Sequence, residues 1–385
     1  MASVTRIALL GSTGSIGQQA LEVVRAFPHR LRVLGLAAGK NQDLLGRQIT
    51  EFQPKLVSFE GSLLPPGARE KPPGAREKPP GAYEKTSLEE MASHPEVDLV
   101  VVATAGRAGL SPTLAALKVG KRVALANKEV LVMAGEIVME AARRSGAPII
   151  PIDSEHSALW QCLAGEDLQA VSRLIITASG GPFLRLSGEE LARVTPQQAL
   201  AHPTWRMGKK VTVDAATLMN KGMEVIEAHW LFAVPYEKVQ VLIHPQSLAH
   251  SLVEFVDGSV KAQLAPPDMR LPIQYALTWP QRWPNTLPRL ELEALTFESP
   301  DLERFPCLRL AQEAGRAGGT YPAVLAGADE AAVELFLEGH IGFLDIPRLV
   351  EEALQKHQGI PHPTLEEVLE AEGWAQAFAR HVLSR

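Results

Sequence analysis

The stretch GSTGSIG, residues 11–17, decides the fold of the N-terminal part of this chain. It follows a short apolar run, Arg6–Leu10, and precedes a helical stretch, Gln18–Phe27, that ends before Pro28. Glycines at positions 11, 14 and 17 allow the backbone to approach a pyrophosphate, which the free N–H groups of a helix N-terminus would stabilise. The spacing is GxxGxxG rather than GxGxxG, so a glycine-rich turn without a ligand remains the alternative.

Short apolar runs alternate with helical stretches through the first 150 residues, which is the pattern of parallel βαβ units. The later strands should be Leu31–Ala37, Asp98–Ala103, Arg122–Ala126 and Pro148–Ile152, and two helices should cover Leu110–Val119 and Val130–Arg144. Because these strands are apolar without alternation, helices must cover both faces of the sheet. We therefore expect an α/β fold with an N-terminal Rossmann-type parallel sheet.

One segment interrupts this pattern. Residues 65–85 read PPGAREK, PPGAREK and PPGAYEK, a unit of seven residues repeated three times. Each unit carries a helix-breaking Pro-Pro-Gly, and three such units are too short for a solenoid. We predict a solvated surface insertion without chemistry.

The remaining chain should fold as an α+β region followed by helices. Asp257-Gly258 is a strong hairpin signal, and the flanking elements are expected at Arg173–Ala178, Thr217–Leu231, Lys238–Ile243, Leu248–Val256 and Ser259–Leu264. A helical bundle should follow, formed by Cys307–Arg316, Ala323–Glu338, Ile346–Lys356 and Leu365–Leu383. The predicted domains are 1–150 for nucleotide binding, 151–280 for catalysis and connection, 281–304 as a proline-rich linker arm, and 305–385 as the helical domain.

The composition argues against nucleic acids and membranes as binding partners. The 385 residues include 38 basic and 44 acidic ones, a net charge of −6, which is the wrong sign for binding nucleic acid through its phosphates. Two cysteines, Cys162 and Cys307, cannot form a disulfide framework and suit a reducing compartment. Apolar runs stay well below the roughly 18 residues of a membrane span, and the N-terminus does not read as a signal peptide. We expect a cytoplasmic protein without nucleic-acid or membrane partners.

The end of the second expected strand indicates the nucleotide. A NAD site usually has an acidic residue about 20 positions after the glycine-rich turn. Here Gly39-Lys40-Asn41 stands 22 residues past Gly17 and contains no acid. Lys40 would attract a 2′-phosphate that a carboxylate would repel, which favours NADP(H). A merely solvated lysine is the alternative.

Carboxylates follow a later strand end. Asp153 and Glu155 point to one side in extended backbone and could share a hard cation such as Mg²⁺ or Mn²⁺, although helix capping is an equal alternative. A third carboxylate, Glu224, lies on a polar helical stripe with Thr217, Asn220 and Lys221. That stripe could simply be a solvated face, and Glu227, one turn further on, is the rival ligand.

Three more stretches carry candidate site residues. Asn127-Lys128-Glu129 ends an expected parallel strand, where open α/β sheets bind ligands. Ser179-Gly180-Gly181 resembles an anion-binding turn. The segment 202–208, HPTWRMG, is suited to closing over a small anionic substrate.

The ordered set of motifs resembles the 1-deoxy-D-xylulose 5-phosphate reductoisomerase family. The matching strings are GSTGSIG, AGKN, LANKE, PIDSEH, TASGGPF, HPTWRMGKK, TLMNKGME and HPQS, which run from residue 11 to 247. The proline-rich arm and the helical tail also fit, whereas the repeated insertion does not. LANKE, DSEH and MNKG together are far more specific than any single string.

The resemblance implies the roles of individual residues. It implies NADPH binding by Thr13, Gly14, Ser15, Ile16, Gly39, Lys40, Asn41, Asn127, Glu129 and Gly208. It implies a divalent cation (Mg²⁺, Mn²⁺ or Co²⁺) held by Asp153, Glu155 and Glu224, with Lys128 and His202 as further catalytic residues. Substrate contacts carried over are Lys128, Ser154, Glu155, Ser179, His202, Asn220, Lys221 and Glu224. The family commonly has Ser where this chain has Ala215, and Thr212 or Thr217 could supply the missing hydroxyl.

The implied reaction is the rearrangement and reduction of 1-deoxy-D-xylulose 5-phosphate to 2-C-methyl-D-erythritol 4-phosphate, on the route to isoprenoids, in a homodimer formed through the middle-domain sheet. Retroaldol and α-ketol rearrangements both stay open. Two alternatives remain: a metal-independent NADP-linked dehydrogenase, such as a semialdehyde or homoserine enzyme, and a regulatory protein that binds NADP(H) without turnover.

Overall fold

The computed structural model describes residues 4–61, 69–70, 82–205, 207–285 and 287–382. The chain divides into two compact units, which are described separately below. Unit 1 comprises Met1–Val130, Val138–Asp153 and Met269–Asn285, and unit 2 comprises Leu131–Ile137, Ser154–Asp268 and Thr286–Arg385. The functional domains at 1–150, 151–280, 281–304 and 305–385 stay a prediction, because packing units and functional domains are different divisions of a chain.

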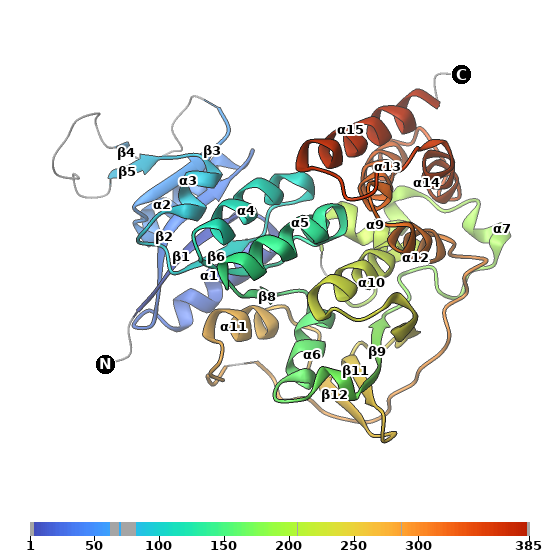
Figure 1. Ribbon diagram of the computed structural model, residues 1–385, viewed down its shortest axis with the longest axis horizontal. Helices are drawn as coiled ribbons and strands as arrows, with labels where there is room; N and C mark the ends of the chain where they lie inside the picture. Colours follow the sequence, from blue (N-terminus) through green and yellow to red (C-terminus); the bar gives the residue numbers. More distant parts are fainter. Residues whose placement is uncertain (1–3, 62–68, 71–81, 206, 286, 383–385) are drawn as a thin grey trace. The chain divides into compact units, whose positions relative to one another are not determined.

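Unit 1 is built on a parallel sheet of eight strands in the order β4-β5-β3-β2-β1-β6-β7-β8 (Figure 1). The strands are β1 Thr5–Leu10, β2 Leu31–Ala38, β3 Leu56–Phe59, β4 Arg69–Glu70, β5 Ala82–Lys85, β6 Leu99–Val102, β7 Arg122–Leu125 and β8 Ile149–Pro151. The chain builds the sheet outward in one direction from β1 and then returns to β6 on its other side. The predicted Rossmann-type sheet is therefore confirmed, and its topological switch point lies between β1 and β6.

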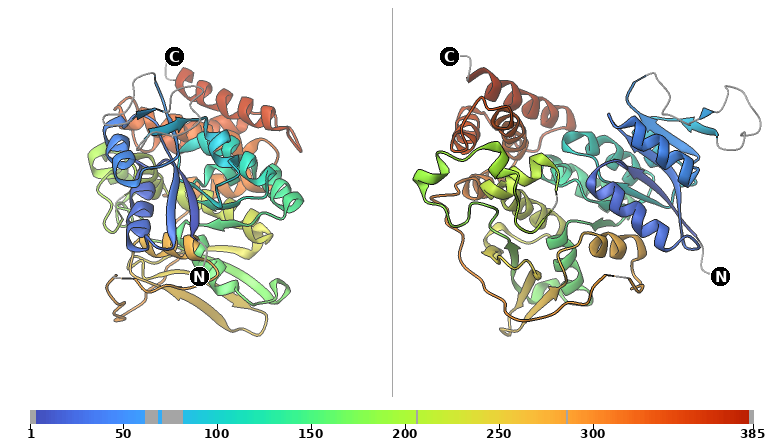
Figure 2. Two further views of the ribbon diagram at one scale, coloured as in Figure 1. Left: turned by 90° about the vertical axis from the view of Figure 1, so that its left-hand side faces the viewer. Right: turned by 180° about the vertical axis from the view of Figure 1, so that it is seen from behind.

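Helices cover both faces of this sheet, as its apolar strands require. Helices α1 Ser15–Ala26 and α2 Gln42–Phe52 lie on one face, and α3 Leu88–Ser93 and α4 Leu110–Lys118 lie on the other (Figure 2). Helix α5 spans Glu129–Ser145, and α11, Arg270–Thr278, adds to the unit from later in the chain. The sequence analysis missed α2, α3 and the short strands β3 and β5.

Most of the repeated segment falls outside the described residues, which include Arg69–Glu70, as β4, and its last four residues. Ala82–Lys85 form β5, which pairs with β3. Tyr83 is fully buried, with its ring 6.5 Å from that of Phe59. The prediction of a solvated insertion is therefore wrong for Ala82 and Tyr83, because the change from Arg to Tyr in the third repeat places an aromatic side chain in the core. Glu84 and Lys85 are exposed.

Unit 2 contains a four-stranded mixed sheet in the order β10-β9-β11-β12. Its strands are β9 Val171–Ala178, β10 Val239–Ile243, β11 Ala249–Phe255 and β12 Val260–Leu264. Strands β9 and β10 are parallel, and the other pairs are antiparallel. The predicted hairpin is confirmed, with Gly258 at a φ of 83°, a conformation that glycine adopts readily.

The helices of unit 2 are α6 Ser154–Leu163, α7 Gly188–Leu191, α8 Pro196–Ala199, α9 Lys209–Thr217, α10 Met219–Phe232, α12 Cys307–Ala317, α13 Tyr321–Leu337, α14 Asp345–Lys356 and α15 Leu365–Val382. The last four are the predicted helical bundle, which is confirmed. Helix α10 packs closely on α12, since a Cβ on Gly222 would lie 2.4 Å from the Cβ of Ala311. Within the described residues, no helix is long and apolar enough to cross a membrane.

The helix predicted over Thr217–Leu231 is two helices meeting at a corner. Leu218 has a φ of 61°, which ends α9 and begins α10. The hydroxyl of Thr217 accepts the N–H of Met219 at 3.2 Å, which offers that N–H an alternative to a helical partner. Thr217 therefore does not share the stripe that carries Asn220, Lys221 and Glu224.

Candidate active site

The glycine-rich turn of unit 1 has no room for a larger residue at Gly11 or Gly17. A Cβ on Gly11, whose φ is 91°, would lie 2.4 Å from the carbonyl oxygen of Ala103, and a Cβ on Gly17 would lie 2.2 Å from that of Gly11. Helix α1 begins after Gly14 with no side-chain cap and no acidic residue in its first turn. The N–H groups of the first turn therefore have no side-chain cap, and a phosphate could accept hydrogen bonds from them. Thr13, Gly14, Ser15 and Ile16 all lie in this turn.

A buried residue that the sequence analysis missed braces the turn. The Gln48 amide in α2 donates to the carbonyl oxygen of Ser12 at 2.9 Å and accepts from the Ser12 hydroxyl at 2.7 Å. Ser12 and Gln48 are both buried, so these bonds are shielded from water. The sequence analysis missed Gln48 because it did not predict α2, whose buried residues are Leu45, Gly46, Gln48 and Ile49.

Gly39, Lys40 and Asn41 follow β2, as expected. Asn41 caps α2, since its side-chain oxygen accepts the N–H of Leu44 at 3.2 Å. Lys40 is exposed. A Cβ on Gly39 would lie 3.4 Å from Oε1 of Glu60, which follows β3. A carboxylate thus stands beside this strand end, and it was overlooked because β3 was not predicted.

The segment after β7 contributes a buried amide and a buried lysine. The Asn127 side chain donates to the carbonyl oxygens of Thr104 at 2.9 Å and Gly106 at 2.8 Å, and so braces the loop after β6. Lys128 Nζ lies 2.8 Å from Oδ2 of Asp153, with 9% and 15% of the two side chains exposed. Glu129 is the first residue of α5 and is half-buried.

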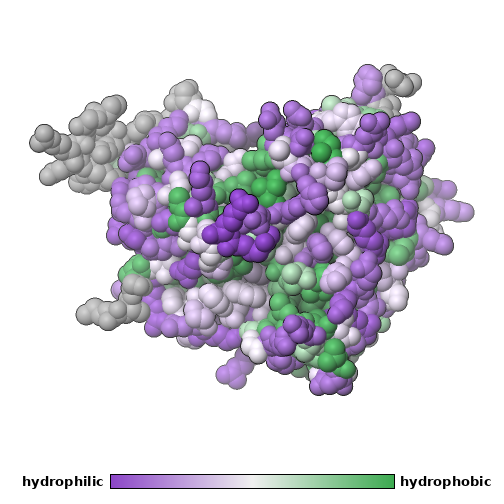
Figure 3. Space-filling model, in the orientation of Figure 1, coloured by the Kyte–Doolittle hydropathy of each residue, from purple (hydrophilic) through white to green (hydrophobic). Residues whose placement is uncertain are grey.

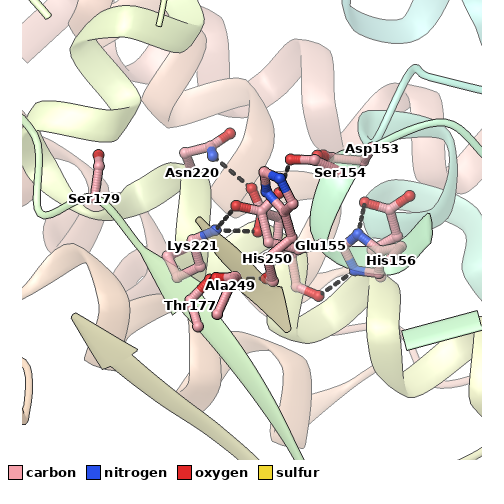
Figure 4. A network of polar contacts seen from close by, with 12 residues as sticks. Asp153, Ser154, Glu155, His156, Thr177, Ser179, Asn220, Lys221, Ala249 and His250 are labelled. Carbon is pink, nitrogen blue, oxygen red and sulfur yellow. Dashed lines mark hydrogen bonds and ion pairs between the residues drawn. The ribbon is translucent and has the colours of Figure 1, made fainter. Parts of the chain in front are cut away.

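A lysine bridges two carboxylates in unit 2 (Figure 4). Lys221 Nζ in α10 lies 2.8 Å from Oε1 of Glu155 in α6 and 2.5 Å from Oε2 of Glu224. Asn220 donates to the other oxygen of Glu224, and Ser154 to the other oxygen of Glu155, both at 2.5 Å. Burial disfavours the charge on Lys221, but the two carboxylates outweigh it and raise its pKa. The lysine therefore carries its charge at neutral pH.

The donor set of this cluster suits a hard divalent cation. Asp153 precedes Ser154 directly in the chain, and single ligand oxygens of Asp153, Glu155 and Glu224 all lie within 4.8 Å of one another. Three carboxylates offer only oxygen ligands, which Mg²⁺ and Mn²⁺ prefer. The residues present fit such an ion.

Glu227, the rival ligand, faces a different partner. His156 Nδ1 lies 3.4 Å from Glu227 Oε2, and His156 Nε2 lies 2.9 Å from the backbone oxygen of Glu224. Because a carbonyl oxygen only accepts, Nε2 carries a proton. Asp153, His156 and Glu227 form a second group with ligand atoms within 4.8 Å of one another, and it includes an imidazole nitrogen.

Ser179 and His202 form the candidate anion site. Gly180 and Gly181 follow Ser179 with φ values of 86° and 68°, a turn that glycine permits. His202 Nδ1 accepts the N–H groups of Thr204 and Trp205 at 3.1 and 2.9 Å, so the proton of the neutral ring lies on Nε2, which donates to Ser179 Oγ at 3.0 Å. Burial lowers the pKa of His202, which keeps the ring neutral.

The two threonines that could replace a hydroxyl at Ala215 are already engaged. The hydroxyl of Thr212 donates to the carbonyl of Gly208 at 2.8 Å, and that of Thr217 donates to the carbonyl of Asp214 at 3.2 Å. Both side chains are buried within their own helix turns. Neither supplies the missing hydroxyl in this conformation. Gly208 itself is the exposed cap residue of α9.

His250 is a site neighbour that the sequence analysis missed. It lies in β11 beside the cluster (Figure 4), and its ring is 6.0 Å from that of Trp205. Burial lowers its pKa to about 4. No local sequence signal marked it, because a single histidine in an expected strand is usually structural.

Comparisons with known proteins agree with this architecture. Family models match residues 7–135 (1-deoxy-D-xylulose 5-phosphate reductoisomerase), 149–232 (the C-terminal domain of the same enzyme) and 264–378 (DXP reductoisomerase C-terminal domain). The 1-deoxy-D-xylulose 5-phosphate reductoisomerase of Pelotomaculum thermopropionicum is 54% identical over 380 residues, covering 98% of both chains. That of Heliobacterium modesticaldum is 53% identical, covering 98% of this chain and 97% of its own.

Solved structures give the same result. A DOX-P reductoisomerase in complex with NADPH, fosmidomycin and magnesium aligns with a TM-score of 0.90 and 38% identity, covering 99% of this chain and 98% of its own. The 1-deoxy-D-xylulose 5-phosphate reductoisomerase of Zymomonas mobilis in complex with NADPH aligns with a TM-score of 0.87 and 38% identity, covering 99% of each chain.

Proposed function

Because the chain belongs to the 1-deoxy-D-xylulose 5-phosphate reductoisomerase family, we infer that it carries out the reaction of that family. It is an oxidoreductase that converts 1-deoxy-D-xylulose 5-phosphate to 2-C-methyl-D-erythritol 4-phosphate, a step of isoprenoid precursor synthesis, and it depends on NADPH and a divalent cation. Family membership decides against a metal-independent dehydrogenase and against a sensor without turnover.

The observation that best supports this function in the chain itself is the bridge from Glu155 through Lys221 to Glu224. We propose that Asp153, Glu155 and Glu224 hold the cation. When bound, the cation stabilises negative charge on substrate oxygens as a Lewis acid, and NADPH supplies the hydride. Lys221 offsets part of the carboxylate charge and limits the repulsion between Glu155 and Glu224.

NADPH is assigned to unit 1. The turn at Thr13, Gly14, Ser15 and Ile16 would receive the pyrophosphate, because its backbone approaches closely and the helix N-terminus favours negative charge. Lys40, between Gly39 and Asn41, would hold the 2′-phosphate. Roles for Asn127 and Glu129 beside the nucleotide, and for Gly208 in unit 2, belong to the same proposal.

The substrate is assigned mainly to unit 2. Ser179, Asn220 and Lys221 would bind the phosphate, with His202 donating through Nε2–H as a neutral group. Ser154 and Glu155 would contact the sugar oxygens. Lys128, held against Asp153, would stabilise developing oxyanion charge or deliver a proton. The segment around Trp205 would exclude water.

A homodimer is proposed through the sheet of unit 2. Strand β12 lies at the edge of that sheet and is largely exposed, and Val256 and Val260 in its hairpin are 72% and 49% exposed. Figure 3 shows hydrophobic surface over this hairpin among mainly hydrophilic side chains. An open edge with apolar side chains favours pairing with a second copy. We also propose a cytoplasmic location, which the low cysteine content suits.

The direct test is NADPH absorbance. Addition of 1-deoxy-D-xylulose 5-phosphate should cause oxidation of NADPH only when Mg²⁺ or Mn²⁺ is present. Oxidation that is independent of metal, or none at all with both metal and substrate, would contradict the proposal.

A further inference from the structure

Three charged side chains of unit 2 meet where α9 contacts α13. Lys210 Nζ lies 2.6 Å from Oδ2 of Asp214 and 2.7 Å from Oδ2 of Asp329. Lys210 and Asp214 belong to α9, and Asp329 belongs to α13. The sulfur of Met223 in α10 is 4.0 Å from the same nitrogen. Lys210, which belongs to α9, therefore contacts side chains of α9, α10 and α13.

Two carboxylates contact the single ammonium group of Lys210. Lys210 and Asp214, four residues apart on one helix, already form a neutral pair. Asp329 adds a second carboxylate whose side chain is 0% exposed, compared with 2% for Asp214. Burying an additional charge opposes folding unless its partners compensate it fully. The ion pair between Lys210 and Asp329 is therefore judged by the two helices that it connects.

The ion pair between Lys210 and Asp329 connects α13 to the first turn of α9. Lys210 is the second residue of that helix and stands two residues after Gly208, the end of segment 202–208. At its other end, α9 turns at Leu218 directly into the part of α10 that carries Asn220 and Lys221. Helix α9 therefore stands in the chain between segment 202–208, which holds His202, and the start of α10.

We propose that Asp329 is a positioning residue for substrate binding: through Lys210 it fixes α9 against α13 and so sets the places of His202, Asn220 and Lys221. It touches neither substrate nor cofactor. The Lys210–Asp214 pair lies within α9, whereas the Lys210–Asp329 pair joins two helices. This inference rests on the proposed roles of His202, Asn220 and Lys221 in binding the substrate.

The two aspartates provide a matched pair of variants. Asp329→Asn removes the connection and leaves the neutral Lys210–Asp214 pair, whereas Asp214→Asn makes the same chemical change and keeps the connection. In the full chain with Mg²⁺ and NADPH, Asp329→Asn should raise KM for 1-deoxy-D-xylulose 5-phosphate about tenfold and change kcat less than threefold. Asp214→Asn should leave KM within about twofold of the wild type.

Two further readouts separate positioning from a loss of stability. The Tm of Asp329→Asn should stay close to that of the wild type, because Lys210 keeps its pair with Asp214, and its Kd for NADPH should be unchanged. Trypsin should cleave after Lys209 or Lys210 faster in Asp329→Asn than in Asp214→Asn, because the first turn of α9 is no longer held. If Asp329→Asn does not fold, Asp329→Ser, which can bond to its own helix backbone, decides by the same measurements.

Equal effects of the two Asn variants on KM, or an unchanged KM in Asp329→Asn, would overturn the inference. The wild type is assayed first in the same buffer. If it does not oxidise NADPH with the substrate, the proposed function fails instead, so the two failures are distinguishable.

Discussion

Lys221 Nζ in α10 lies 2.8 Å from Oε1 of Glu155 in α6. These residues are 66 positions apart in the chain, and the ammonium group also contacts Glu224. A buried ammonium group between two carboxylates offsets their mutual repulsion and holds them close together. The lysine therefore keeps two carboxylates of the proposed cation site in place.

The first prediction concerns Glu224. Glu224→Gln keeps the size of the side chain but removes a charge that a hard cation requires. We expect it to fold and to bind NADPH normally, while kcat falls by roughly two orders of magnitude or more, about 3 kcal/mol of transition-state stabilisation. Its affinity for Mn²⁺, followed by electron paramagnetic resonance, should fall as well.

Glu227→Gln is the control for this variant, because Glu227 faces His156 one helical turn away. It should keep most of the activity. A dead Glu227 variant beside an active Glu224 variant would place the cation in the group of Asp153, His156 and Glu227 instead.

The second prediction concerns the cofactor. Lys40→Asp replaces an attractive charge with a repulsive one next to the proposed 2′-phosphate. The Kd for NADPH should rise roughly tenfold or more, and the effect should shrink at high salt because Lys40 is exposed. The Kd for NADH, measured by fluorescence, should change little. An equal loss for both nucleotides would show that Lys40 lies away from the phosphate.

The third prediction concerns the turn that precedes α1. Gln48→Leu removes both hydrogen bonds between Gln48 and Ser12, which are both buried residues. We expect the free energy of unfolding to fall by about 1–3 kcal/mol, because the polar groups of Ser12 lose their partner. NADPH binding should weaken several-fold while KM for the sugar phosphate stays the same. Gln53→Leu, at the exposed end of α2, serves as the control and should leave NADPH binding intact.

The fourth prediction concerns pH. The pKa of His250 is about 4 in the folded protein, compared with 6.5 for an unburied histidine. Above pH 6.5 the ring is neutral in both the folded and the unfolded chain, so it contributes no pH dependence. As pH falls from 6.5 toward 4, the unfolded chain takes up the proton first, which costs the fold about 3 kcal/mol.

His250→Gln should remove this part of the acid sensitivity. Urea unfolding of both proteins at pH 7 and pH 4.5 gives the comparison, and the gap between the two pH values should be smaller for the variant. An equal gap in both proteins would show that His250 does not titrate in this window.

The fifth prediction concerns the repeated segment. Deletion of residues 65–78 removes two repeats and with them β4, but keeps β5 and Tyr83. Stability and activity should be nearly unchanged, since shortening a surface connection alters loop entropy by only about 0.6 kcal/mol per twofold change in length. Tyr83→Ala, in contrast, should cost about 3–5 kcal/mol because that side chain is fully buried. Thermal unfolding distinguishes the deletion from Tyr83→Ala, and insoluble protein after the deletion would contradict this prediction.

Sequence periodicity located the elements with strong local signals. The glycine-rich turn, the apolar parallel strands, the Asp257-Gly258 hairpin and the four C-terminal helices all follow from spacing within about 20 residues. Elements with weak local signals were not predicted. β3 has only four residues, and β5 begins inside a repeat whose first two copies resemble a solvated loop. Nothing local distinguishes Tyr83 as a core residue until β3 stands beside it.

The sequence by itself determined the residue types of the candidate site, which are three carboxylates and a lysine after the second strand, and the family to which the motifs belong. Only the tertiary structure decided how each group is used. The corner at Leu218 separates Thr217 from Lys221, His156 takes up Glu227, and the helix backbone occupies the hydroxyls of Thr212 and Thr217. Residue types are local properties of the chain, whereas hydrogen-bond partners and charge pairs depend on which distant segments pack together.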